Sequence, residues 1–262
     1  YSWEASRKIQ HKVGLLKFAY LTNTNKLNYF NVFSSEEREL AIDDYVYLHP
    51  EYDTDDGSLE WVYDMEQTIY ADKEYEKTAP ENYRIIADDL FQYTRYTSDF
   101  VIPAVSYTFT YNSQQEDKSS NFNYLQAEVK LAGNLTRAMA GVFNFPTVEM
   151  PTGEKVYEVF GVPFSQFAKF NVNYSHHLQL GQNEASVLAW RVYFGLTLPY
   201  GNSSVQLPFS EMYFGGGVNY ERGWLAYDLG PGSVQGKTNS YNIGNLKLTA
   251  SVEYRFPVYR SL

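Results

Sequence analysis

The chain has 262 residues, no cysteine and a formal net charge of −10. Without cysteine, a disulfide framework, a thiol nucleophile and a cysteine-ligated metal site are excluded for these residues. The acidity is local, because residues 36–89 hold 18 acids and 4 bases whereas the other residues hold 13 acids and 17 bases. No basic stripe of the density that a nucleic-acid binder needs is present, so no nucleic-acid partner is predicted.

The first hundred residues show little of the regular alternation that predicts a sheet. Residues 1–22 are interpreted as partial barrel strands, with a tail at 1–6 and a further strand at 12–22. Residues 23–100 form an acidic segment that we expect to be a folded external excursion, with candidate helices at 40–48 and 83–93. A disordered acidic loop is the alternative, but the many aromatic residues of the segment argue against it.

Residues 101–262 alternate apolar and polar side chains with a period of two. The pattern runs through 101–112, 122–135, 167–180, 185–199 and 246–256. These segments have 11 to 15 residues, whereas ordinary strands have about five or six and a membrane strand needs roughly 9–11. Since no stretch approaches the roughly 20 apolar residues of a spanning helix, we predict an all-β fold, an antiparallel transmembrane β-barrel. A soluble β-sandwich, which also has one apolar face, is an alternative.

The connections between these segments differ in length. The connection at 180–184 is tight and that at 112–121 is moderate, whereas 23–100, 136–166 and 200–245 are long. Short turns on one side and long loops on the other are typical of outer-membrane barrels. We therefore expect the three long connections to emerge on the same, extracellular side.

Glycines are concentrated in the connection at 200–245, around a single arginine. Dense glycines permit positive φ and close approach of other chain segments. The next strand places Glu253 on its polar face, and an arginine can pair with a carboxylate through two hydrogen bonds. A solvated turn arginine and a strand glutamate that faces water are the alternative. The candidate loop residues are Gly215, Gly216, Gly217, Arg222, Gly223 and Trp224.

Signatures of enzymes are missing from the sequence. It contains no Gly-x-Ser-x-Gly, phosphate loop or His-Glu-x-x-His. No catalytic residue, cofactor or metal site is therefore predicted.

The run at 207–224, with Leu229-Gly230-Pro231-Gly232 after it, carries a family resemblance. It resembles the sixth extracellular loop of the BamA/TamA family, the outer-membrane assembly and translocation barrels also grouped as bacterial surface antigen proteins. Weaker matches lie at 107–112, 133–135 and 199–202, and together they look most like the TamA-like branch of Bacteroidota. The resemblance covers residues 100–262 well and the first hundred poorly.

The resemblance implies that this loop folds back into the barrel, where Arg222 meets an inward-facing acid, Glu253. It also implies a sixteen-stranded barrel after periplasmic POTRA domains, of which the chain holds about six or seven strands. The expected location is the outer membrane of a Gram-negative bacterium. The expected partners are outer-membrane lipids, unfolded outer-membrane protein clients, the POTRA domains and the remaining strands. A passive porin or transporter is the alternative function.

Overall fold

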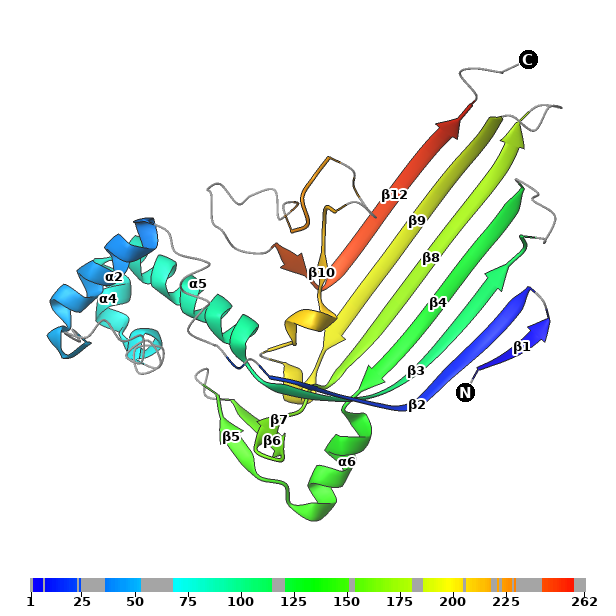
Figure 1. Cartoon of the computed structure of the whole chain (residues 1–262). Helices are drawn as coiled ribbons and strands as arrows, with labels where there is room; N and C mark the ends of the chain where they lie inside the picture. Colours follow the sequence, from blue (N-terminus) through cyan, green and yellow to red (C-terminus); the bar gives the residue numbers. More distant parts are fainter. Residues whose placement is uncertain are drawn as a thin grey trace.

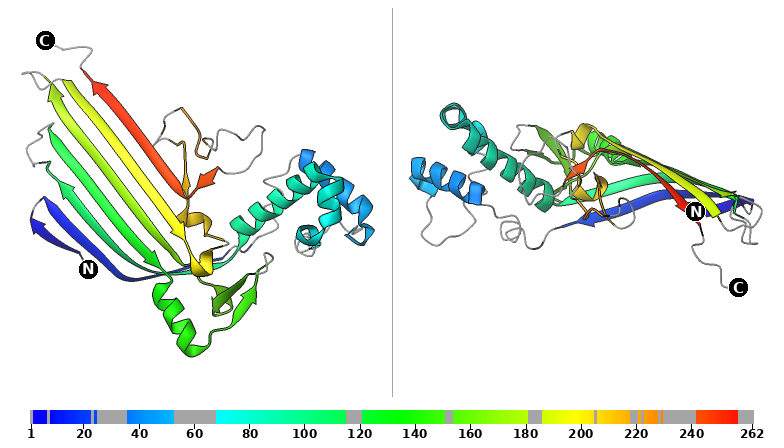
Figure 2. Two further views of the ribbon diagram at one scale, coloured as in Figure 1. Left: turned by 180° about the vertical axis from the view of Figure 1, so that it is seen from behind. Right: turned by 90° about the horizontal axis from the view of Figure 1, so that it is seen from above.

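The computed structural model describes most of the chain, and its centre is an antiparallel sheet in which the strand order is β1-β2-β3-β4-β8-β9-β12 (Figure 1). The described residues are 2–6, 8–22, 24, 36–52, 68–114, 121–150, 154–180, 186–204, 206–217, 221, 223–227, 229 and 242–256. The strands of the sheet are β1 (Ser2–Ser6), β2 (Ile9–Leu21), β3 (Phe100–Asn112), β4 (Phe122–Ala132), β8 (Phe167–Leu180), β9 (Ser186–Pro199) and β12 (Leu246–Arg255). The sheet is a twisted open wall that ends at β1 and β12 (Figure 2).

The two faces of the wall differ as the period-two pattern requires. One cross-strand row on the polar face joins Glu128, Asn171, Gly195 and Lys247 as successive Cα partners. The other face is apolar, and no segment that the structure describes covers it, with Val129 38%, Val172 37% and Val252 72% exposed. A water-soluble sandwich would bury such a face against a second layer, whereas the outer face of a membrane barrel meets lipid.

The strands expected from alternation are all present, and β4 and β2 differ most from the expectation. The strand expected at 122–135 stops at Ala132, because Gly133 adopts a φ of 74° and helix α6 (Asn134–Phe143) begins after it. The prediction was therefore wrong for residues 133–135. In β2 the pairing with β3 shifts register between Gly14 and Lys17. This bulge exchanges the faces on which side chains project, which explains the mixed pattern of that strand.

The three long connections leave the same end of the sheet (Figure 1). Between β2 and β3 lie α2 (Glu36–Leu48), η1 (Pro50–Tyr52), α4 (Lys73–Thr78) and α5 (Pro80–Thr97). Between β4 and β8 lie α6, β5 (Thr147–Glu149), β6 (Lys155–Val159) and β7 (Val162–Pro163). Between β9 and β12 lie η2 (Gly201–Ser203), η3 (Phe209–Glu211), β10 (Tyr213–Phe214) and β11 (Ile243–Gly244). None of the helices that the structure describes is long and apolar enough to cross a membrane.

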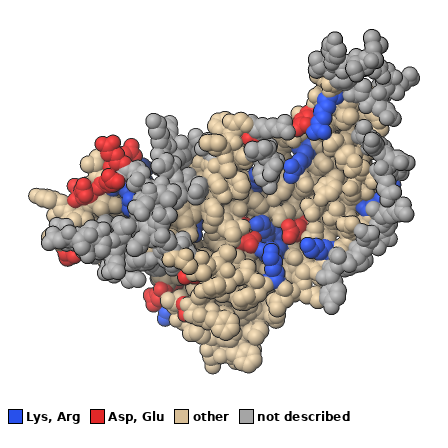
Figure 3. Space-filling view, viewed as in Figure 1, with Lys and Arg blue, Asp and Glu red and all other residues tan. Residues whose placement is uncertain are grey.

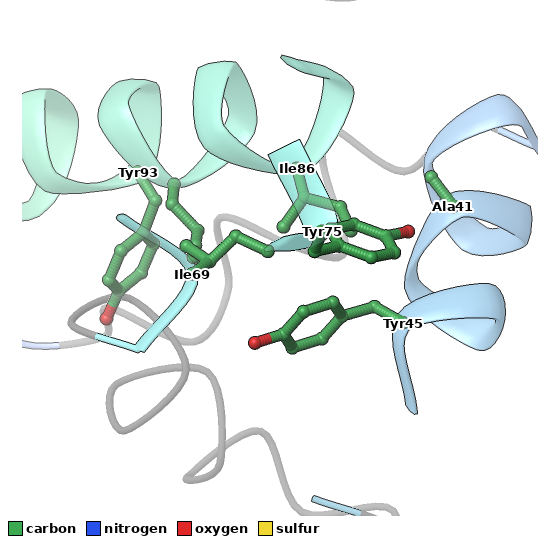
Figure 4. Packing of buried hydrophobic residues seen from close by; sticks show 7 residues of the cluster. Ala41, Tyr45, Ile69, Tyr75, Ile86 and Tyr93 are labelled. Carbon is green, nitrogen blue, oxygen red and sulfur yellow. The ribbon is translucent and has the colours of Figure 1, made fainter. Parts of the chain in front are cut away.

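The described part of the acidic segment is a folded helical unit with its own small core. The buried residues of this core are Ala41, Tyr45, Ile69, Tyr75, Ile86, Leu90 and Tyr93 (Figure 4). An ion pair between Arg38 Nε and Asp89 Oδ2, 2.6 Å apart, joins α2 to α5. The Tyr75 hydroxyl donates to Asp44 Oδ2 at 2.9 Å. Burial, followed by this hydrogen bond, raises the pKa of Tyr75. Aromatic packing thus gives the described part of this segment an ordered core.

Candidate functional site

A shielded carboxylate joins the connection after β9 to the polar face of the wall. Glu211 ends η3, and its side chain is 12% exposed. Lys130 Nζ lies 2.5 Å from Glu211 Oε1, and Lys169 Nζ lies 3.2 Å from Glu211 Oε2. The two lysines are Cα partners on β4 and β8, so their like charges lie close together. The carboxylate between them converts this repulsion into two ion pairs.

The main chain of η3 is held at the same place. The carbonyl oxygen of Glu211 accepts hydrogen bonds from Lys169 Nζ and from the Thr197 hydroxyl, both at 3.1 Å. Thr197 is fully buried in β9. Figure 3 shows acidic and basic side chains gathered near the middle of this face. Three strands therefore fix one residue of the loop.

Tyr213 provides a second anchor one strand row further along the wall. Its hydroxyl donates to Asn171 Oδ1 at 2.5 Å, and the Tyr193 hydroxyl donates to the same oxygen at 3.0 Å. The ring of Tyr213 lies over Gly195, where an added Cβ would come within 2.7 Å of it. Burial raises the pKa of Tyr213, so its hydroxyl remains a donor. Gly195 is required here because it leaves space for a ring, not because it bends the strand.

The glycine run forms a tight turn after β10. Gly216 and Gly217 have φ of 81° and 91°, which side chains rarely adopt. A Cβ on Gly216 would also collide with the carbonyl oxygen of Leu225. The Gly216 amide donates to Glu221 Oε2 at 2.9 Å, and the Gly217 amide donates to the Trp224 carbonyl at 3.0 Å. The glycines thus permit the close contacts that Glu221 and Trp224 make with this stretch.

A third set of contacts ties the connections to one another at the strand ends. Asn202 Nδ2 donates to the carbonyl oxygens of Tyr157 and Phe164, both at 2.8 Å, and Asn202 Oδ1 accepts from the Tyr157 amide at 2.6 Å. Asn134 Oδ1 accepts from the Tyr200 hydroxyl at 2.9 Å. The weaker sequence matches at 133–135 and 199–202 therefore meet in space.

The Omp85 superfamily domain matches residues 65–261 of this chain. The chain belongs to the Omp85 superfamily. No curated protein matches it significantly. Omp85 superfamily domains are characteristic of the bacterial outer membrane or its organelle equivalents, and the superfamily is linked to insertion and translocation of outer-membrane proteins. The match begins before β3, so the Omp85 domain includes helices that the sequence resemblance did not reach.

In this Omp85 chain the structure describes one partner of the predicted Arg222–Glu253 pair. Arg222 lies outside the described residues. Glu253 lies on the polar face of β12 opposite Ala189, and its carboxylate accepts from Arg255 Nη2 at 2.6 Å. The described loop meets β12 near its start, where Lys247 Nζ donates to the Phe214 carbonyl at 2.7 Å. Glu253 lies six residues beyond Lys247, or about 20 Å along the strand. The Arg222–Glu253 pair therefore remains a prediction.

Sequence reasoning missed the anchor that the structure describes in this Omp85 domain. Alternation did place Lys130 and Lys169 on polar faces, and an acid between two inward-facing lysines of neighbouring strands stabilises both charges. That acid, Glu211, lies in an irregular connection, where no periodicity indicates which way a side chain points. The unmatched lysines were the signal that could have directed attention to it.

Proposed function

We propose that this chain is part of the barrel of a BamA/TamA-like factor that helps insert or export outer-membrane proteins in a Gram-negative bacterium. The observation that carries this proposal is the loop anchored through Glu211 to Lys130 and Lys169 on the polar face. A loop folded onto the inner wall, behind an uncovered apolar outer face, fits a barrel in which the lumen is occupied. An open porin channel fits it less well.

The proposed mechanism is mechanical and involves no bond chemistry. Edge strands of a barrel offer unpaired backbone groups to an incoming strand, so a client hairpin can extend the sheet. The gate between the first and last strands is expected outside this chain, as are the POTRA domains. The described wall supplies the support, because the anchors at Glu211 and Tyr213 brace β4, β8 and β9 from the lumen.

The pairing of Arg222 with Glu253 belongs to this proposal. An arginine fork on a carboxylate would fix the direction of the loop as well as its position. In the protein that carries this chain, a double-mutant cycle of Arg222→Ala and Glu253→Ala measures the coupling. A coupling of about 1 kcal/mol or more supports the pair. Additive effects would rule it out, and Arg255→Ala is the control because Arg255 already contacts Glu253.

Activity in vesicles tests the function itself. The protein that carries this chain is reconstituted into phosphatidylcholine vesicles, and an unfolded outer-membrane β-barrel client is added. We expect the client to become heat-modifiable on gels faster than in empty vesicles and faster than beside a porin. Steady single-channel conductance without any acceleration of client folding would favour the passive porin instead.

A further inference from the structure

Helix α6 presents an apolar face that no described segment covers. Four side chains spaced along one side of the helix are exposed: Leu135 66%, Met139 43%, Val142 75% and Phe143 66%. Their i, i+4, i+7, i+8 spacing defines a single stripe. On the other side, Ala140 is buried and the Arg137 guanidinium lies 4.3 Å from the centre of the Tyr157 ring, whereas Gly141 is exposed.

This stripe is continuous with the apolar outer face of the wall. Helix α6 begins two residues after the end of β4, with Gly133 between them. Leu131, Ala168 and Leu198 form the last cross-strand row on the apolar face at this end. Leu131 is 38% and Leu198 48% exposed. Figure 1 places α6 directly at the end of β4 and away from β10, which lies with the loop over the polar face. The apolar surface therefore extends from the strands onto the helix.

The distribution of charge separates α6 from the other helices. Arg137 is the single charged residue of the helix, which contains no acid. Acidic side chains gather instead over the helical unit of α2, α4 and α5 (Figure 3). An anionic membrane surface repels that acidic unit, but it does not repel α6, because α6 contains no acid. A helix of 10 residues is too short to bind lipid strongly alone, but the strand that precedes it already holds it at the surface.

We propose that α6 lies in the headgroup layer of the membrane at the rim of the barrel, with its apolar stripe in the acyl boundary. An interfacial helix of this kind buries its apolar face about 5–10 Å into the boundary. The helix then lies beside the ends of β4 and β8, at the level where these strands leave the membrane. This inference rests on the proposed function, since it takes the apolar face of the sheet as the lipid-facing one.

Lipid quenching of a fluorescent label tests the placement. In the whole protein, reconstituted into phosphatidylcholine vesicles that contain nitroxide-labelled lipid, an environment-sensitive label is attached to Val142→Cys, Gly141→Cys or Val172→Cys. Gly141 is the matched control, because it is exposed on the other side of the same helix and an added Cβ there meets Arg137 at an ordinary 3.9 Å. Val172 lies on the apolar face of β8 and reports on the wall itself.

We expect the label at position 142 to be quenched at least about twofold more than the label at 141. It should respond most to nitroxides near the headgroup, whereas the label at 172 should respond to deep ones. Quenching at 172 with none at 142 would overturn the placement of α6 and leave the membrane wall standing. Equal quenching at 141 and 142 would overturn the orientation of the stripe. No quenching at 172 would refute the proposed barrel itself, and α6 with it. Leu135→Cys repeats the measurement on the same stripe if Val142→Cys does not fold.

Discussion

The substitution Glu211→Gln removes the charge of the loop anchor and keeps its shape. The carboxylate is 12% exposed and bridges Lys130 and Lys169, which are 12% and 13% exposed. Removing one partner of a buried ion pair costs about 3–5 kcal/mol, because the other charge is left shielded and unpaired. The carbonyl of Glu211 still accepts two hydrogen bonds in the variant, so the low end of that range, about 3 kcal/mol, is expected.

Amide hydrogen exchange in the whole reconstituted protein measures this cost at the loop. A loss of about 3 kcal/mol corresponds to exchange about a hundredfold faster in residues 206–217, if these amides exchange by opening of the loop. Glu149→Gln, at an exposed glutamate of β5, is the control and should leave these amides unchanged. If the loop amides of Glu211→Gln exchange within about twofold of the wild-type rate, the carboxylate contributes nothing to docking and this prediction is wrong.

Three further substitutions test other parts of the structure. Gly195→Ala should free Tyr213 from the wall and cost about 1–3 kcal/mol, seen as faster exchange at 213–214, whereas Gly141→Ala should be neutral or slightly stabilising; equal effects would contradict the close packing at Gly195. Asn202→Ala leaves three backbone groups without their partner and should lower the free energy of unfolding by about 2–4 kcal/mol. An unchanged midpoint of denaturant unfolding would show that these hydrogen bonds do not stabilise the connections. Tyr75→Phe should destabilise the helical unit by about 1–2 kcal/mol at pH 8. The pKa of Tyr75 is raised above 10.0 in the folded protein, so the phenol of the unfolded chain ionises first as pH rises. The difference in the free energy of unfolding between the wild type and Tyr75→Phe should therefore shrink above that pH. A difference that stays constant between pH 8 and 11 would refute this linkage.

The strands were predictable because apolar side chains recur at every second residue and so share one face of the sheet. In β8 the alternation runs without a break over Phe167–Leu180, and the observed bounds are the predicted ones. Prediction failed at the end of β4, where Gly133 redirects the chain into a helix whose first residues still continue the apolar pattern. A period of two and a period of 3.6 cannot be distinguished over two residues.

The candidate site was only partly predictable, for a different physical reason. The glycine stretch at 215–217 was recognisable, because backbone positions with positive φ are usually occupied by glycine. The anchor at Glu211 depends on pairs 81 and 42 residues apart in sequence. No local pattern encodes those pairs, because they follow from the alignment of β4 and β8 beneath a loop without periodicity. Gly195 likewise looks like an ordinary strand glycine until the ring of Tyr213 is placed above it.

We propose that this Omp85 domain braces a barrel that accelerates the folding of other barrels. The most direct measurement is the rate at which an unfolded outer-membrane client folds in vesicles that contain the protein, compared between the wild type and Glu211→Gln at equal protein content. We expect the wild type to accelerate client folding over empty vesicles, Glu211→Gln to lose most of that acceleration, and Glu149→Gln to keep it. Client folding as slow with the wild type as in empty vesicles would contradict this proposal.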